Sequence, residues 1–331
     1  MLNGEKIIDV KDLCIGFNNI DGKIEVVTRM SFHINKGETV GIVGESGCGK
    51  SLTALGLMRL LQIPPGYIEG ELNFEGKNLL ALSNKEMRKI RGNQISMIFQ
   101  EPMTSLNPVI SIGEQIVETY LQHQKISKKE AFEKSKAILQ VVGIAEPERR
   151  LREYPHQLSG GMRQRIMIAM ALACNPKLLI ADEPTTALDV TIQAQILEVM
   201  KDLKKNFNTA IMLITHDLGV VAEMCSRAII VYCGRIVEEA PVEKLLTDPQ
   251  HPYTMGLLNS IAKLGVKEKL YVIPGTVPSP ANYPKGCVFN PRCTFACEKC
   301  QLEEPPMTEA ADSHFVRCWR NVNTGVMEDI K

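Results

Sequence analysis

A glycine-rich loop at residues 44–51 constrains the fold of this chain more than any other segment. Its sequence, Gly-Glu-Ser-Gly-Cys-Gly-Lys-Ser, follows the apolar run 39–43 and precedes a helix-forming stretch that starts at Lys50. Loops of this composition between a strand and a helix bind phosphates, because the glycines let backbone N–H groups approach the phosphate oxygens. We therefore expect a buried strand that ends at a nucleotide phosphate site.

Individual roles follow from the chemistry of such loops. The ammonium group of Lys50 should reach the β- and γ-phosphate oxygens, and the Ser51 hydroxyl should bind Mg²⁺. The residues predicted to contact the nucleotide from this segment are Gly44, Ser46, Gly47, Cys48, Gly49, Lys50, Ser51 and Leu52.

The rest of the first 240 residues alternates between strand-like and helix-like patterns, which predicts an α/β fold with a parallel sheet flanked by helices. Residues 5–43 and 68–100 have strand character, whereas residues 110–155 are charged and helical in period, as in an inserted helical subdomain. Further apolar strands are predicted at 95–99, 178–181, 210–214 and 228–232.

Two carboxylates follow the predicted strand 178–181. A carboxylate at the carboxyl end of a parallel strand faces the ligand crevice. We expect Asp182 to support the Mg²⁺ ion and Glu183 to act as the general base that polarises the attacking water.

Two further polar residues follow neighbouring strands. His216 follows the strand 210–214 and is a candidate donor to the γ-phosphate, and Gln100 follows 95–99 and is a candidate ligand of the metal or the water. Spacing alone leaves a structural role for either residue equally open.

A second candidate anion site lies at residues 158–165, Leu-Ser-Gly-Gly-Met-Arg-Gln-Arg. The step Ser159, Gly160, Gly161 leads into a helix, whose exposed N–H groups and positive terminus suit an anion. One ATP site needs only one such helix start, and the loop 44–51 already supplies it. The second helix start therefore predicts a site shared between two copies of the domain.

Composition narrows the class of protein. Lys plus Arg and Asp plus Glu both number 38, and this zero net charge argues against a nucleic-acid partner. No run approaches about 18 apolar residues and no N-terminal signal is evident, so we expect a membrane role only through a partner. Five of the ten cysteines fall within residues 287–318, which in reducing cytosol favours metal binding over disulfides.

The ordered motifs resemble those of ABC-transporter ATPases over about residues 5–240. In this family the loop 44–51 is followed by the Q-loop at Gln100, the signature at 158–165, Walker B at 178–183, the D-loop at 187–189 and the switch histidine at 216. The resemblance implies a RecA-like P-loop NTPase core with an antiparallel β region and an inserted helical subdomain at about 101–160. We expect a nucleotide-binding domain at 1–240 and a separate, loop-rich C-terminal extension at 241–331.

The same resemblance implies how ATP is held. Two ATPs lie at a head-to-tail dimer, and the Ser159 signature of each chain closes on the γ-phosphate of its partner. The adenine should stack on an aromatic residue upstream of the loop, for which Phe17 is the match, although Val26 and Val27 are also candidates for lining that pocket.

A narrower resemblance, to the dipeptide/oligopeptide permease ATPases, covers nearly the whole chain. It rests on segments 101–108, 154–157 and 251–254 and on the tail from Ile273 to Cys318. It implies a second, similar ATPase, two transmembrane permease subunits and an extracytoplasmic peptide-binding protein, with this chain at the cytoplasmic face of a prokaryotic membrane. Segment 101–108 and the helical subdomain would meet the membrane subunits.

The tail cysteines are candidate metal ligands. Cys287, Cys293, Cys300 and Cys318 stand singly at uneven spacing, which suits zinc poorly because zinc sites commonly show short cysteine pairs. The permease resemblance implies a [4Fe–4S] cluster on these four, with zinc or free thiols as alternatives. Cys297 is a possible substitute ligand and creates a radical-SAM-like spacing, but Lys299 replaces the usual aromatic and the expected barrel is absent.

The leading hypothesis is therefore an ATP-hydrolysing subunit of a peptide importer. Import of nickel or another small solute is one alternative. A soluble ABC ATPase that acts in iron–sulfur assembly or on ribosomes is another.

Overall fold

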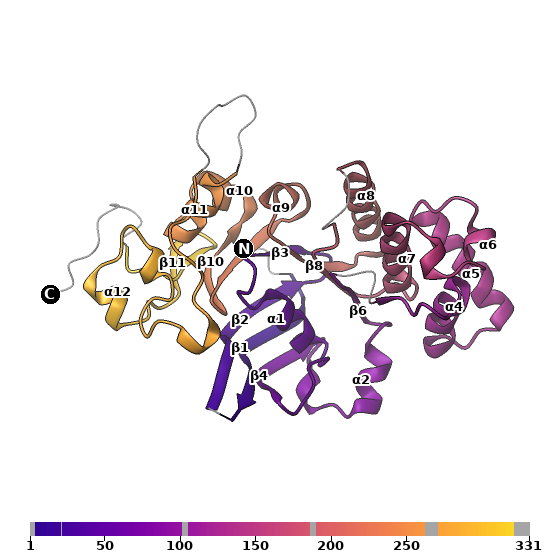
Figure 1. Ribbon diagram of the computed structural model, residues 1–331, viewed down its shortest axis with the longest axis horizontal. Helices are drawn as coiled ribbons and strands as arrows, with labels where there is room; N and C mark the ends of the chain where they lie inside the picture. Colours follow the sequence, from indigo (N-terminus) through magenta and orange to yellow (C-terminus); the bar gives the residue numbers. More distant parts are fainter. Residues whose placement is uncertain (1–3, 21, 101–104, 186–189, 262–270, 321–331) are drawn as a thin grey trace.

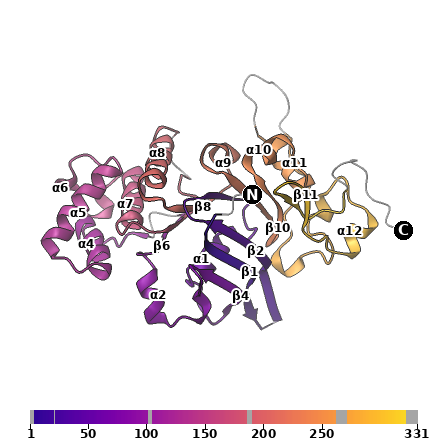
Figure 2. The same cartoon turned by 180° about the vertical axis from the view of Figure 1, so that it is seen from behind.

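The structure is a computed structural model that describes residues 4–20, 22–100, 105–185, 190–261 and 271–320. In this part of the chain the strands form two sheets, and helices cover the larger one (Figure 1). A lobe of helices lies at one end of the molecule, and the segment after residue 271 lies at the other (Figure 2).

The larger sheet has the strand order β11-β12-β10-β9-β3-β8-β7-β6. Its five parallel strands are short, apolar and almost entirely buried, as expected for strands covered on both faces. They are β3 (Thr39–Val43), β6 (Ile95–Ile98), β7 (Leu178–Asp182), β8 (Ala210–Thr215) and β9 (Arg227–Tyr232). The strands β10 (Arg235–Pro241), β11 (Thr308–Ala311) and β12 (His314–Val316) are added antiparallel.

The smaller sheet is antiparallel, with the order β2-β1-β4-β5. Its strands are β1 (Lys6–Asn19), β2 (Gly22–Asn35), β4 (Gly66–Phe74) and β5 (Lys77–Asn78). One face shares a core with β3 and with helix α1 (Lys50–Leu57). The sheets approach closely at Gly234, where a Cβ atom would lie 1.9 Å from the Val26 carbonyl oxygen, so the site requires glycine.

The helical lobe contains α4 (Ile112–His123), α5 (Lys128–Val141), α6 (Pro147–Arg150) and α7 (Gly160–Leu172). Serine caps begin three of these helices, because the hydroxyls of Ser111, Ser127 and Ser159 accept backbone N–H groups of the first turn. The buried faces of α4, α5 and α7 share one core with α8 (Val190–Phe207) and with β6, β7 and β8. None of the described helices is long and apolar enough to cross a membrane.

The remaining helices are short. They are α2 (Asn84–Ile90), α9 (Leu218–Met224), α10 (Val242–Thr247), α11 (Pro252–Asn259) and α12 (Glu298–Leu302). Single 3₁₀ turns lie at Leu79–Ala81, Pro155–Gln157, Pro280–Asn282 and Asn290–Arg292.

The predicted strands at 39–43, 95–99, 178–181, 210–214 and 228–232 are confirmed to within about one residue. The strand character assigned to residues 68–100 is wrong for α2, which begins with a capping box between Ser83 and Glu86. In the extension after residue 241, β11 and β12 continue the larger sheet through β10.

Candidate nucleotide site

The glycine-rich loop lies where the sequence places it, between the buried strand β3 and helix α1. Gly47 and Gly49 have φ angles of 80° and 99°, in the left-handed region that favours glycine. A Cβ atom on Gly44 would lie 2.2 Å from the Val231 carbonyl oxygen, so the loop passes directly against β9. These glycines fix the curvature of the loop.

Lys50 lies inside this curve. Its ammonium group donates to the carbonyl oxygens of Gly44 at 2.7 Å and Glu45 at 3.0 Å, and the side chain is buried. The loop therefore surrounds a single positive charge with its own backbone, which is the arrangement that a phosphate chain needs.

Ser51 and Asp182 meet at the start of α1. The Ser51 hydroxyl donates to Asp182 Oδ1 at 3.1 Å, which joins α1 to the end of β7. Burial raises the pKa of the Asp182 carboxyl group, and the hydrogen bond from Ser51 opposes that shift. A hydroxyl and a carboxylate side by side are ligand types that Mg²⁺ prefers, so these residues fit the predicted metal.

Three strand ends converge on the Glu183 carboxylate. Gln100 Nε2 donates to Glu183 Oε2 at 3.4 Å, and His216 Nδ1 lies 3.3 Å from Glu183 Oε1. Glu183 itself has a φ of 47°, unusual for a residue with a side chain, and its N–H donates to the Ile214 carbonyl oxygen at 2.9 Å. The ends of β6, β7 and β8 thus bring the three predicted catalytic residues together.

A cavity of about 240 Å³ opens beside the loop. It is lined by Val26, Ser46, Gly47, Gly49, Lys50, Ser51, Leu52, Gln100 and Glu183. The predicted residue Phe17 is half-buried on β1 and does not line this cavity, whereas the alternative Val26 does. Cys48 is fully buried and does not line the cavity.

The signature segment does not line this cavity. Ser159 is the N-cap of α7, its hydroxyl accepts the Met162 N–H at 3.3 Å, and a Cβ atom on Gly160 would contact nothing within 4 Å. Gln164, one turn further, donates to the Pro184 carbonyl oxygen at 2.6 Å, which ties α7 to the residue after Glu183. The signature is thus an exposed helix start that lies outside the cavity of its own chain.

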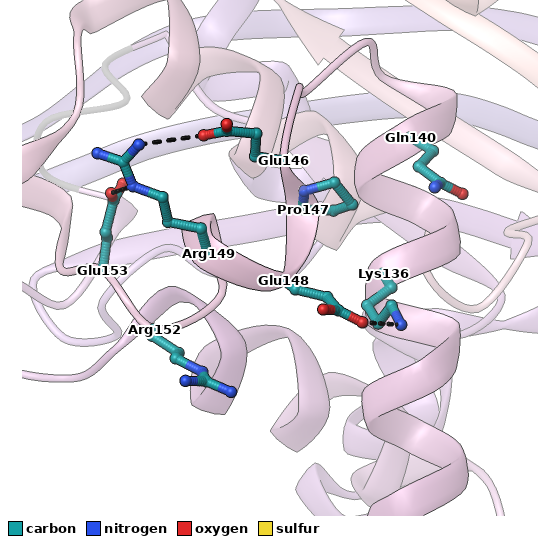
Figure 3. A pocket seen from close by; sticks show the side chains of 8 residues that line it. All are labelled: Lys136, Gln140, Glu146, Pro147, Glu148, Arg149, Arg152 and Glu153. Carbon is teal, nitrogen blue, oxygen red and sulfur yellow. Dashed lines mark hydrogen bonds and ion pairs between the residues drawn. The ribbon is translucent and has the colours of Figure 1, made fainter.

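A larger cavity, of about 780 Å³, lies in the helical lobe between α5 and α6 (Figure 3). Five of its six charged side chains are paired with one another: Lys136 with Glu148, and Arg149 with Glu146 and Glu153. The cavity contains none of the predicted site residues.

In the described residues, the tail cysteines are not grouped as a set of metal ligands. Cys297 Sγ and Cys300 Sγ lie 3.5 Å apart, but no group of three or more His, Cys, Asp or Glu side chains in the described ranges is placed to hold a metal ion. Burial raises the pKa of Cys287 to about 12 and that of Cys318 to about 11. The geometry therefore does not support the predicted [4Fe–4S] cluster or the zinc alternative.

Two predicted segments cannot be placed in full. The D-loop at 187–189 and residues 101–104 of the segment expected to meet membrane subunits lie outside the described residues. Residues 105–108 precede α4, and Gln115 of that helix donates to the Asn107 carbonyl oxygen at 3.0 Å.

Comparison with known proteins agrees with this geometry. The sequence model of the ABC transporter family matches residues 27–186, and that of the oligopeptide/dipeptide transporter C-terminal region matches residues 237–300. The oligopeptide transport ATP-binding protein OppD of Bacillus subtilis is 52% identical to this chain, over 96% of this chain and 90% of that protein. The chain belongs to the oligopeptide/dipeptide ABC transporter ATPases.

Other relatives of this ABC ATPase agree with the assignment. The oligopeptide transport ATP-binding protein AppD of Bacillus subtilis is 54% identical over 95% of this chain and 96% of that protein. Among solved structures, a dimeric post-hydrolysis state of the ATP-binding cassette MJ0796 bound to ADP and Pi matches with a TM-score of 0.65 and 28% identity, covering 71% of this chain and 98% of that one. The RecA-like fold and the ATPase activity predicted from the sequence are thereby confirmed.

Sequence reasoning missed two residues that contact the phosphate loop from far along the chain. Tyr253 and Arg292 both bind Glu45, the second residue of the loop. A single sequence contains no signal for such contacts, because 208 and 247 residues separate the partners.

Proposed function

We propose that this ABC ATPase powers peptide uptake through partner membrane subunits. The observation that carries the proposal is the Glu183 carboxylate, which stands between Gln100 and His216 at the edge of the cavity that contains Lys50. A carboxylate beside a phosphate-binding lysine suits activation of a water for attack on the terminal phosphate.

The roles of the side chains follow from their positions. Lys50 neutralises charge on the β- and γ-phosphates, and Ser51 with Asp182 would hold Mg²⁺, which supplies further neutralisation of the phosphate charge. Glu183 orients and polarises the water, Gln100 holds the carboxylate from the opposite side, and His216 is the donor toward the γ-phosphate. Val26 rather than Phe17 forms the described wall next to the loop.

The signature acts on a second chain in this proposal. Ser159, Gly160 and Gly161 form an exposed helix start outside the cavity of their own chain, which fits an anion that a partner ATPase brings. The related cassette MJ0796 is a dimer in its structure with ADP and Pi. We propose the same kind of pairing here, with a second copy or a similar ATPase.

The peptide substrate is supported by the relatives. Two proteins that match nearly the whole chain are named for oligopeptide transport, and the C-terminal region matches the oligopeptide/dipeptide family. These names favour peptides over nickel and over a soluble iron–sulfur assembly ATPase. We propose that the chain binds two permease subunits at the cytoplasmic face of the membrane and serves an extracytoplasmic peptide-binding protein.

The variant Glu183→Gln tests the catalytic assignment. It keeps the shape of the side chain but removes the base, so steady-state ATP hydrolysis should fall at least about 100-fold while ATP binding persists. Hydrolysis and binding of radiolabelled ATP measure the two properties separately. Turnover near the wild-type rate would show that another group activates the water.

A mixed dimer tests the signature. One chain carries Lys50→Ala and the other Ser159→Ala, so action across the dimer leaves one complete site, whereas action within a chain leaves none. We expect about half of the wild-type activity. Complete loss in the mixed dimer, with each parent also inactive, would place the signature on its own ATP.

The cysteine cluster enters no step of this mechanism. The [4Fe–4S] cluster on Cys287, Cys293, Cys300 and Cys318 stays a prediction that rests on the family resemblance. Iron and zinc analysis of anaerobically purified protein decides it. About four irons per chain would support the cluster, and metal-free protein would refute it.

A further inference from the structure

The C-terminal extension holds the phosphate loop at one residue, Glu45. The carboxylate of Glu45 accepts two hydrogen bonds from the Arg292 guanidinium, Nη1 to Oε2 at 2.6 Å and Nη2 to Oε1 at 3.1 Å. The Glu45 backbone N–H donates to the Tyr253 hydroxyl oxygen at 2.8 Å. Both the main chain and the side chain of this loop residue are therefore bound by residues after 241.

Arg292 is itself fixed in place. Its side chain is 4% exposed, its Nε donates to the Pro274 carbonyl oxygen at 2.8 Å, and its Nη1 lies 3.4 Å from the Tyr232 hydroxyl oxygen. A buried arginine that binds a carboxylate with two parallel hydrogen bonds is directional as well as charged, so it defines where the carboxylate lies.

The surrounding aromatic side chains make the contact rigid. The rings of Tyr232 and Tyr253 lie 4.6 Å apart between centroids, and Phe289 contacts both, at 5.2 Å and 5.4 Å. Tyr232 belongs to β9 of the larger sheet, Tyr253 to α11, and Phe289 to the turn before Arg292. The two side chains that bind Glu45 are thus packed against the sheet that carries the loop.

Glu45 is also one of the two residues, with Gly44, whose carbonyl oxygens hold Lys50. Its carbonyl oxygen accepts the Lys50 ammonium at 3.0 Å, and it accepts the Cys48 N–H at 3.4 Å. A shift of Glu45 would move one of the two carbonyls that hold the phosphate-binding lysine. The chain of contacts from Arg292 to Glu45 to Lys50 joins the C-terminal extension to the nucleotide site.

We propose that Arg292 is a positioning residue for ATP: it holds the phosphate loop in its binding conformation through Glu45, and Tyr253 assists it. This inference rests on the proposed function only in that the loop binds ATP. It gives the C-terminal extension a direct part in nucleotide binding.

The test compares single variants of the full-length chain. Arg292→Met removes both hydrogen bonds, whereas Arg292→Lys keeps the charge but loses the paired geometry. We expect the Kd for Mg·ATP, and the KM in the hydrolysis assay, to rise about tenfold in Arg292→Met and less in Arg292→Lys. The kcat at saturating ATP should stay within about twofold, because no reacting atom is touched.

Arg317→Met is the matched control. Arg317 also lies in the extension, and it pairs with Glu304 at 3.2 Å and donates to the Ile236 carbonyl oxygen at 3.0 Å, without contact to the loop. Its replacement should lower the melting temperature but leave the Kd for ATP unchanged. Equal Kd values for Arg292→Met, Arg317→Met and the wild type would overturn the proposal.

Glu45→Gln keeps the test decisive if Arg292→Met does not fold. It weakens the same ion pair from the loop side, so the Kd must again rise, and an unchanged Kd overturns the proposal. The two single changes weaken the same ion pair, so their effects on ATP binding should not add. The double variant Glu45→Gln, Arg292→Lys should therefore bind ATP about as weakly as the weaker-binding single variant. A wild-type chain that binds no ATP would instead refute the proposed function.

Discussion

A buried carboxylate on β10 gives the sharpest test of how the extension is anchored. Glu238 has no exposed surface and accepts three hydrogen bonds: from the Gln250 N–H at 2.6 Å, from the His251 N–H at 3.0 Å and, at 2.7 Å, from His314 Nε2. Two of these reach Oε1 and one reaches Oε2. The perturbation that we consider is Glu238→Gln, which preserves size and shape.

The loss in the free energy of unfolding depends on how many of the three N–H donors the glutamine can still satisfy. With its oxygen in the Oε1 position, the glutamine keeps the contacts to Gln250 and His314, but its NH₂ group then faces the His251 N–H, so two donors meet. In the opposite orientation the NH₂ group would face the Gln250 N–H and His314 Nε2, so two hydrogen bonds would be lost instead of one. Loss of one buried hydrogen bond to a charged acceptor costs about 1.5–3 kcal/mol. For a chain of this length, about 2.5 kcal/mol corresponds to a fall of roughly 4 °C in melting temperature.

Urea unfolding followed by circular dichroism measures this difference. The control is Glu243→Gln on the exposed side of α10, which should change the free energy of unfolding by less than about 0.5 kcal/mol. If Glu238→Gln proved as stable as this control, the reasoning from buried donors would be refuted.

Two further predictions concern titratable groups. Burial lowers the pKa of His251 to about 4 in the folded protein. As the pH falls below about 6.5, the unfolded state therefore takes up a proton at this residue before the folded state does. The stability that is present above pH 6.5 is then lost progressively towards pH 4. His251→Asn, which can still cap α11, should remove about 2 kcal/mol of the loss measured by urea unfolding between pH 7 and pH 5; an unchanged loss would exclude His251 as its source. Burial raises the pKa of Asp182, so its ionised form destabilises the metal-free fold at neutral pH. Asp182→Asn should therefore raise the melting temperature without Mg²⁺ and abolish the rise caused by Mg·ATP, and a lower melting temperature without Mg²⁺ would contradict this account.

The sequence indicates which residues follow the strand ends because those signals are local. The glycines before Lys50, the carboxylates after the strand 178–181 and the residues that follow 95–99 and 210–214 each depend on neighbours in the chain. Parallel strands then place their carboxyl ends together, so Gln100, Glu183 and His216 meet without further information.

The features that the sequence did not predict depend on register and distance. The choice between Phe17 and Val26, both of them candidates in the sequence, depends on strand register: Val26 lines the cavity, and register shifts interrupt the pairing of β1 with β2. Helix α2 is only seven residues long and lies among strands, so its capping box was the only local indication. The Arg292–Glu45 pair joins segments 247 residues apart, and only the packing of the extension brings them together.

The hydrogen bond from Gln164 to the Pro184 carbonyl oxygen has a consequence for a dimer. Gln164 lies one turn into the helix that Ser159 caps, and Pro184 directly follows Glu183. In the proposed pairing, Ser159 contacts the partner's nucleotide while Glu183 serves the nucleotide of its own chain. If α7 tilts when the partner's nucleotide changes, this hydrogen bond would transmit the tilt to the backbone of Pro184, beside the Glu183 carboxylate that serves the chain's own nucleotide. In that pairing, this one hydrogen bond connects, within each subunit, the helix that contacts one ATP to the residue beside the carboxylate that serves the other.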